Sequence, residues 1–415
     1  MKIRAKISQL RSNKDARALM SNFVWLSVLK VIGYIFPLIT LPYLSRVIGV
    51  EGFGEIAFAS SIIVFIETFA DFGFNYTATR DIARIRSDVG TISTIFTNVF
   101  WTKILLMIVG FLILCILVYF IPSLYDKRLL LFITFLYIPG HIIFPDWFFQ
   151  AMEKMKYITI LNVLSKAIFT ILIFIVIREK DDYLWQPLLT AIGYCISGII
   201  SMYYIFKKFQ IRIHKPSIYA IKNSIRSSYS MFLSLIIPNL YTNFSTILLR
   251  TTCGEVATGI FDAGKRFESI ISQISEVLSR TFYPFLARRL DKHHIYTLIQ
   301  LFFSISGSLF LFFGANFLVD LFYTSEFNSA TEVIRIFSVS PIAIFLMNTY
   351  GTNYLVLKGK EKIYRNIIIV CAIIGFILTL VLTPRYSYIG ASITIVFVWC
   401  IRGLMTYCVA KKYSR

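Results

Sequence analysis

The sequence predicts an all-α integral membrane protein, and three observations lead to that fold class. The 415 residues are 57% hydrophobic and have a mean hydropathy of +0.71. Charged residues make up only 15% of the chain, whereas soluble domains carry roughly 25%. The apolar residues also form long runs, and a helix of about 20 apolar residues is long enough to cross a bilayer.

Twelve apolar segments are predicted to be transmembrane helices. Several of them contain Pro or Gly, which membrane helices tolerate better than soluble helices do. In chain order they cover residues 20–45, 55–75, 98–121, 129–151, 157–177, 184–206, 228–250, 256–283, 296–319, 331–356, 364–383 and 388–410.

The basic residues predict that both termini are cytoplasmic. With that orientation the inner segments hold 27 Lys and Arg, and the outer loops hold 7. Such an excess on one side sets the topology of membrane proteins. It also accounts for the formal net charge of +20, so nucleic acid is not an expected partner. The N-terminal residues 1–20 lack the apolar core and cleavage site of a signal peptide, and we expect them to be retained.

The chain also repeats itself. The stretch VIGVEGFGEIAFA begins at Val47, and TCGEVATGIFDAG begins at Thr252. Their glycines match at an offset of 205, about half the chain: Gly49 with Gly254, and Gly54 with Gly259. We therefore predict two six-helix bundles, 1–206 and 228–415, joined by the basic linker 207–227. Because six spans is an even number, the repeats should be parallel, around a central cavity typical of transporters.

One predicted span, 256–283, carries far more charge than the others. Spacings of 4, 3, 4, 3 and 4 place the following residues on one helix face: Asp262, Arg266, Ser269, Gln273, Glu276 and Arg280. A helix lying flat on the membrane surface is the alternative, but it would leave an odd number of spans and break the repeat. In a span this face cannot contact lipid, because each central charge costs roughly 3 kcal/mol. We expect it to line a water-filled cavity.

The charged and amide side chains of this and other spans are the candidate site. Adjacent Lys and Arg suit a phosphate, and acids in the same cavity suit coupling to a proton or another cation. The candidate substrate-binding residues are Arg266, Lys265, Arg250, Lys30, Arg280, Asn239 and Asn243. The candidate ion-coupling or cavity acids are Asp262, Glu268, Glu276, Glu67 and Asp71. Lys103 and Arg335 lie near span ends and should snorkel, and His141 is interpreted as a structural residue.

Several kinds of chemistry lack their sequence signatures. The chain contains no G-x-x-x-x-G-K-[ST] and no H-E-x-x-H motif. Its six cysteines form no C-x-x-C pair, so we expect no metal, no cofactor and no enzymatic activity. A membrane enzyme of glycan assembly is a remaining alternative, but its acids would be expected on a sizeable outer loop. Glu51 and Glu55 lie in a loop too short to hold a substrate alone.

Two stretches of the N-terminal half carry a family signature. They are LPYLSRVIGVEGFGEIAFASSI and ADFGFNYTATRDIAR. They resemble the polysaccharide flippases of the O-antigen type, in the superfamily of the multidrug-and-toxin extruders and the peptidoglycan lipid flippase. The family pattern of paired glycines, Asp-Phe-Gly and a basic stretch is met by Gly49, Gly54, Asp71, Phe72, Gly73, Arg80, Ile82, Ala83 and Arg84. The eighth span matches at Gly259, Phe261 and Ala263, and departs at Asp262 and Lys265.

The resemblance implies a function. Such a protein moves an undecaprenyl-pyrophosphate-linked oligosaccharide across the bacterial inner membrane by alternating access, driven by an ion gradient or the membrane potential. Its partners would be the lipid-linked oligosaccharide, membrane lipids, a polysaccharide polymerase and a chain-length regulator. An ion-coupled multidrug or cation extruder of the same fold is the alternative, although its cavity would be mostly acidic and aromatic.

Overall fold

The computed structural model describes residues 14–85 and 88–413, and all regular secondary structure within them is helical. The predicted all-α class is therefore confirmed. Nine helical runs in this part of the chain are long and apolar enough to cross a membrane. Several of them have hydropathies far above those of soluble helices, such as Val89–Phe120 and Glu361–Lys412. The chain is thus a multi-pass membrane protein, while the count of twelve crossings stays a prediction.

Internal contacts divide the chain into two units. Unit 1 comprises residues 1–40, 66–178 and 184–233, and unit 2 comprises residues 41–65, 179–183 and 234–415. Residues 41–65 therefore group with the C-terminal part of the chain. The predicted division into bundles 1–206 and 228–415, with a central cavity, stays a prediction.

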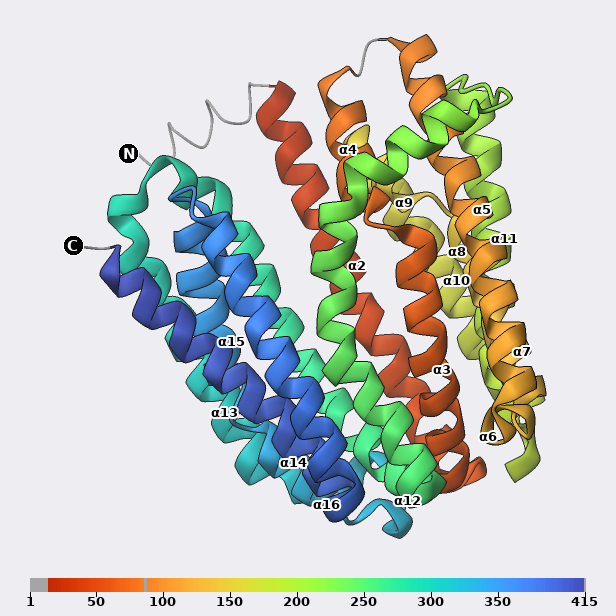
Figure 1. Cartoon of the computed structure of the whole chain (residues 1–415), viewed down its shortest axis with the longest axis vertical. Helices are drawn as coiled ribbons and strands as arrows, with labels where there is room; N and C mark the ends of the chain where they lie inside the picture. The colour runs from red at the N-terminus through yellow and green to blue at the C-terminus, as the bar shows by residue number, and fades with distance from the viewer. Residues whose placement is uncertain (1–13, 86–87, 414–415) are drawn as a thin grey trace. The chain divides into compact units, whose positions relative to one another are not determined.

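The helices of the first half include four short ones between α5 and α10 (Figure 1). They are α2 (Lys14–Val47), α3 (Gly49–Asp71), α4 (Phe74–Arg84), α5 (Val89–Phe120), α6 (Pro122–Tyr125), α7 (Arg128–Phe135), α8 (Tyr137–Ile143), α9 (Asp146–Ala151), α10 (Met155–Val176), the 3₁₀ helix η1 (Lys180–Leu184) and α11 (Trp185–Lys208). In unit 1, α11 packs against both α8 and α10, and α4 packs against α9. Buried aromatic side chains fill the core, with Phe96 stacked on Trp147 at 5.6 Å between ring centroids.

Local sequence sets two helix boundaries in unit 1. Asp88 caps α5 by accepting hydrogen bonds from the backbone N–H groups of Gly90 and Thr91, at 3.0 and 3.1 Å. Between α3 and α4 the backbone enters the left-handed region at Phe72 (φ 46°) and Gly73 (φ 78°). This break ends α3 directly after Asp71 and starts α4 before Asn75, so both side chains can face the same group of helices.

The helices of the second half include two very long ones. They are α12 (Ile218–Arg288), η2 (Leu290–Lys292), α13 (His293–Phe322), η3 (Ser325–Phe327), α14 (Ala330–Phe337), α15 (Ser340–Leu346), the π-helix η4 (Met347–Val356) and α16 (Glu361–Lys412). Within unit 2, α16 packs against α14, α15 and η4, and α13 packs against α14 and α15.

Both long helices fold back on themselves (Figure 1). The backbone of α12 breaks at Gly254 (φ 89°, ψ 179°), a conformation open to glycine. Lys265, beyond the break, donates a hydrogen bond to the carbonyl of Thr242 before it, so the two arms lie side by side. In α16 the break is at Ser387 (φ 52°), and Arg402 in the second arm bonds to Tyr364 in the first.

The glycines of the sequence repeat have equivalent structural roles in unit 2. Gly49 (φ 63°) and Gly254 (φ 89°) both have left-handed backbones at a turn. A Cβ at Gly54 would lie 1.9 Å from the carbonyl oxygen of Glu255, and one at Gly259 would lie 2.0 Å from that of Val50. Val50 and Glu255 are related by the same offset of 205. Two helix ends thus pack reciprocally, backbone against backbone, because neither glycine carries a side chain.

Candidate functional site

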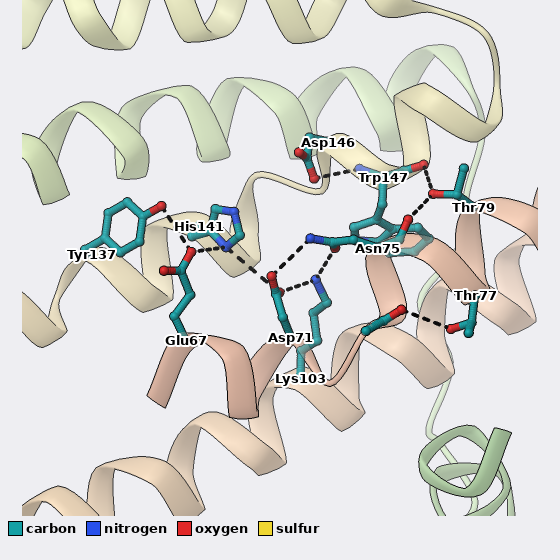
Figure 2. Close-up of polar contacts among 11 residues, drawn as sticks. Glu67, Asp71, Asn75, Thr77, Thr79, Lys103, Tyr137, His141, Asp146 and Trp147 are labelled. Carbon is teal, nitrogen blue, oxygen red and sulfur yellow. Dashed lines mark hydrogen bonds and ion pairs between the residues drawn. The ribbon is translucent and has the colours of Figure 1, made fainter. Parts of the chain in front are cut away.

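The largest network of ionisable side chains inside the described spans lies in unit 1, and we call it the polar cluster. It contains Glu67, Asp71, Asn75, Lys103, Tyr137, His141 and Asp146 (Figure 2). Glu67 and Asp71 lie one turn apart at the end of α3, and Asn75 lies in the first turn of α4. Lys103 comes from α5, Tyr137 and His141 from α8, and Asp146 from α9. The cluster therefore joins five helices that are separate in the sequence.

Lys103, Asp71 and Asn75 form a closed triangle. The Nζ of Lys103 lies 2.7 Å from Asp71 Oδ1 and donates to Asn75 Oδ1 at 2.9 Å. Asn75 Nδ2 donates in turn to Asp71 Oδ2 at 3.0 Å. The Lys103 side chain is only 3% exposed. The expectation that it snorkels to the membrane surface is therefore wrong, because its ammonium group reaches inward to the Asp71 carboxylate.

His141 lies between the two acids of α3. Its Nδ1 is 3.6 Å from Glu67 Oε1 and 3.9 Å from Asp71 Oδ1. The hydroxyl of Tyr137, one turn earlier on α8, donates to Glu67 Oε1 at 3.2 Å. The rings of Tyr137 and His141 stack, with 5.6 Å between their centroids. Tyr194 of α11 packs edge-on against both rings. His141 therefore contacts the two acids as part of an ordered aromatic wall.

Asp146 completes the cluster at the start of α9. Its Oδ1 accepts a hydrogen bond of 2.7 Å from the backbone N–H of Trp147. The Trp147 carbonyl accepts a bond of 3.1 Å from Thr79 Oγ1, which ties α9 to α4. Trp147 itself is 1% exposed. The third carboxylate is thus held by the backbone of a rigid, buried turn.

The charge balance of the polar cluster favours binding of a cation. Three carboxyl groups face one lysine and one histidine, so with all three ionised the cluster has a net negative charge even when His141 is protonated. Donor atoms of Glu67, Asp71 and His141 lie within 4.8 Å of one another, a spacing that could hold a metal ion. A divalent ion there would sit beside the Lys103 ammonium, which already bonds to Asp71. A singly charged cation or a proton fits these electrostatics better.

The predicted cavity residues of α12 are paired locally in unit 2. Arg266 Nη2 lies 2.7 Å from Asp262 Oδ2, one turn away, and its guanidinium carbon is 5.2 Å from the centre of the Phe53 ring. Arg280 pairs with Glu276 in the same way, and Ser272 donates to Glu268. This geometry supports a structural role for Arg266, in which it neutralises Asp262. A role in substrate binding stays a prediction for Arg266 and Arg280, as does ion coupling for Asp262, Glu268 and Glu276.

The other predicted site residues also have identifiable surroundings. Lys265 reaches the Thr242 carbonyl at 3.5 Å, and Asn243 donates to Asn239 at 3.0 Å. Arg250 pairs with Glu55 and with Glu255, at 2.5 and 3.3 Å. The side chain of Lys30 lies outside the described residues. Glu67 and Asp71 lie in the polar cluster, but their predicted role in ion coupling is not decided by geometry alone.

Sequence reasoning missed the partners of Glu67 and Asp71. Lys103 was expected to snorkel, and His141 was interpreted as structural. One signal was available, because Tyr137 and His141 lie four residues apart in an apolar segment and therefore on one helix face. That spacing alone does not say which of the other helices this face meets.

Comparisons with known proteins match this architecture. The sequence profile described as "Polysaccharide biosynthesis protein" matches residues 19–290, about two thirds of the chain. The chain belongs to this family. A relative from Escherichia coli K12, named "Putative O-antigen transporter", is 27% identical over 398 residues, covering 94% of this chain and 96% of the relative. The capsular polysaccharide biosynthesis protein CapF of Staphylococcus aureus is 24% identical over 268 residues, covering 60% of this chain and 66% of the relative.

Solved structures confirm the transporter fold. The lipid II flippase MurJ in an inward closed conformation gives a TM-score of 0.73 at 11% identity, covering 94% of this chain and 87% of that one. An inward-facing multidrug transporter of the MATE family gives a TM-score of 0.67 at 14% identity, covering 92% and 98%. At such identities the similarity shows the fold of this family member and no substrate. The resemblance stated from the sequence motifs is confirmed by the family match.

Proposed function

We propose that this family member is a flippase for a lipid-linked oligosaccharide. It would move an undecaprenyl-pyrophosphate-linked unit of a surface polysaccharide from the cytoplasmic to the outer leaflet of the bacterial inner membrane. The observation that carries the proposal is similarity along 94% of the chain to a relative named as an O-antigen transporter. The MurJ-like fold supports it, because that solved structure is named a lipid II flippase.

Alternating access would move the polar head group while the lipid tail stays in the bilayer. Both termini would be cytoplasmic, because basic residues concentrate in the segments assigned to that side. A polysaccharide polymerase and a chain-length regulator would receive the product on the other side. The proposed activity makes and breaks no covalent bond, so the protein would act as a transporter and not as an enzyme.

We further propose that the polar cluster binds the coupling cation. Its carboxyl groups lie inside predicted spans, where ionisable residues mark ion pathways, and the Glu67 side chain keeps 23% of its surface exposed. Lys103 compensates Asp71 by direct contact, while Glu67 contacts only Tyr137 and His141 among the partners described above. Glu67 is therefore the carboxylate best placed to exchange a proton or a monovalent cation during transport.

A deletion strain of the native host tests the main proposal. Loss of surface polysaccharide, with lipid-linked oligosaccharide accumulating in the inner leaflet, is the expected result. Restoration by the plasmid-borne gene is the control. A deletion strain with normal surface polysaccharide and increased sensitivity to cationic drugs would instead favour the multidrug extruder that the MATE fold leaves open.

Proteoliposomes test the coupling proposal. Glu67→Gln should lower gradient-driven transport roughly tenfold to hundredfold, because charged hydrogen-bonding groups contribute about 1.5–3 kcal/mol. A proton gradient and a sodium gradient applied separately would identify the cation. The exposed control Glu179→Gln should transport normally. Unchanged gradient dependence in Glu67→Gln would exclude the polar cluster from coupling.

A further inference from the structure

Arg402 differs from the three predicted site arginines of unit 2 in its charge compensation. Arg250, Arg266 and Arg280 each form an ion pair with a carboxylate. In the part of the chain that the structure describes, no carboxylate forms an ion pair with Arg402. Its guanidinium donates to the hydroxyl of Tyr364 and lies 5.5 Å from the centre of that ring, and Tyr241 lies close to it.

Arg402 also lies deep in a span. It is ten residues before Lys412, the end of α16, which places it about 15 Å along the helix from that end. The hydrocarbon core of a bilayer is about 30 Å thick, so with the core beginning at the end of α16, Arg402 would lie well inside it. A permanent positive charge at this depth is costly, and it normally has a counter-charge or a function.

Three helical arms hold the guanidinium in place. Nη2 of Arg402, in the second arm of α16, donates to the hydroxyl of Tyr364 in the first arm at 3.1 Å. Tyr364 packs on Gly351 of the π-helix η4, where a Cβ would lie 2.4 Å from its ring. Tyr241, from the first arm of α12, is 2% exposed and packs on Gly375. Two glycines thus make room for the two tyrosine rings.

One nitrogen of the Arg402 guanidinium has no hydrogen-bond partner in the described structure. Nε of Arg402 is buried and has no hydrogen-bond partner among the described residues. The fork formed by Nε and a terminal nitrogen is the one that binds a phosphate through two parallel hydrogen bonds. Tyrosine hydroxyls can donate to the remaining oxygens of such a group. A lysine, or an arginine that served only to stabilise the fold, would not need this arrangement of a planar fork and two tyrosine hydroxyls.

We propose that Arg402, with Tyr241 and Tyr364, binds a phosphate oxyanion carried by a lipid within the membrane. The oxyanion supplies the missing counter-charge, and its lipid origin explains how it reaches this depth. The site lies wholly in unit 2, and none of its three residues is among the site residues predicted from the sequence. It goes beyond the proposed function and rests on it only for the choice of a polyprenyl diphosphate as probe.

The test uses the purified full-length protein in nanodiscs and measures two quantities, ligand affinity and the midpoint of thermal unfolding. The probe is a C55 polyprenyl diphosphate. Arg402→Gln should weaken its binding roughly tenfold to hundredfold, because hydrogen bonds to a charged group are lost. Arg402→Lys should bind with intermediate affinity, since it keeps the charge and loses the fork. Arg335→Gln is the matched control, because that arginine is exposed and bonds to Asn316.

The unfolding midpoint separates binding from structure. If Arg402 serves to bind the ligand, Arg402→Gln without probe should unfold at the same temperature as the unchanged protein or at a higher one. Adding the probe should no longer raise the unfolding midpoint of this variant. A lower midpoint together with normal probe binding would overturn the proposal. If Arg402→Gln cannot be purified folded, Arg402→Lys decides, and unchanged affinity in that variant would overturn it as well.

Two further probes identify the source of the phosphate. Competition by inorganic pyrophosphate would show that the phosphate group alone is recognised. Competition by phosphatidylglycerol vesicles, and none by phosphatidylcholine vesicles, would assign the site to an anionic phospholipid head group. Failure of the proposed function has a different signature. A deletion strain with normal surface polysaccharide would reject the flippase, whereas loss of probe binding in Arg402→Gln would still support the site.

Discussion

In unit 1 the charges of the polar cluster come from separate helices, whereas two ion pairs of unit 2, Asp262–Arg266 and Glu276–Arg280, each lie along one helix, α12. Lys103 of α5 compensates Asp71 of α3, and His141 of α8 contacts Glu67 and Asp71. On α12, Arg266 pairs with Asp262 and Arg280 with Glu276, four residues apart in each case. The first arrangement exists only when the bundle is assembled, while the second exists as soon as the helix forms.

This difference predicts how each group responds to mutation. An ion pair buried between helices leaves an uncompensated charge inside the bundle when one partner is removed. A local pair on a partly exposed face leaves a charge that water can still reach. The two regions should therefore differ most in stability, even if both are required for transport.

The largest effect is expected for Lys103→Met. Asp71 would lose its buried partner, at a cost of about 3–5 kcal/mol in the free energy of unfolding. Equilibrium unfolding in detergent, or folded abundance in the membrane, would measure it. The double variant Lys103→Met/Asp71→Asn should recover much of the loss, because the Asp71 charge that lost its partner is also removed. A single variant as stable as the unchanged chain would mean that the contact contributes little.

The contact between α3 and α12 in unit 2 is expected to depend on close glycine packing in addition to the Arg250–Glu55 ion pair. Gly54→Ala should destabilise the fold by about 1–3 kcal/mol, because its Cβ would overlap the carbonyl oxygen of Glu255. Gly314→Ala is the matched control, since its Cβ would have its nearest neighbours at 3.9 Å. Thermal unfolding of both variants would measure the difference, and equal midpoints would contradict the reciprocal packing of the repeat.

Arg266→Ala should cost less than about 1 kcal/mol of stability, since the side chain is 39% exposed and its partner is on the same helix. If Arg266 binds the substrate, the same variant should abolish surface polysaccharide at normal membrane abundance. Arg266→Lys should restore it only in part, because the bidentate fork is lost. Recovery of function in Asp262→Ala/Arg266→Ala would show that the ion pair has a structural role and that Arg266 does not bind the substrate.

The smallest effect is expected for Arg280→Ala. Its side chain is 63% exposed and pairs with Glu276 on the same helix, so the variant should lose no more than about 0.5 kcal/mol. Thermal unfolding should show a midpoint close to that of the unchanged chain. A loss as large as that of Lys103→Met would show that Arg280 is compensated between helices, and the comparison would no longer hold.

The sequence by itself determined the features that depend on neighbours along the chain. Hydropathy and length predicted an all-helical membrane protein, because a helix satisfies its own backbone in lipid. The matched glycines predicted a repeat, and their backbones have the same roles at Gly49 and Gly254. Spacing placed Asp262 and Arg266 on one face, and their ion pair follows from that spacing.

Only the tertiary structure decided which helices meet. Nothing near Lys103 in the sequence shows that its side chain reaches Asp71, 32 residues earlier. Nor does the sequence around Arg402 show that two tyrosines surround it without a carboxylate. The physical reason is that a periodic pattern fixes the face on which a side chain lies, whereas its partner depends on how distant helices pack. The polar cluster and the Arg402 site are both products of that packing.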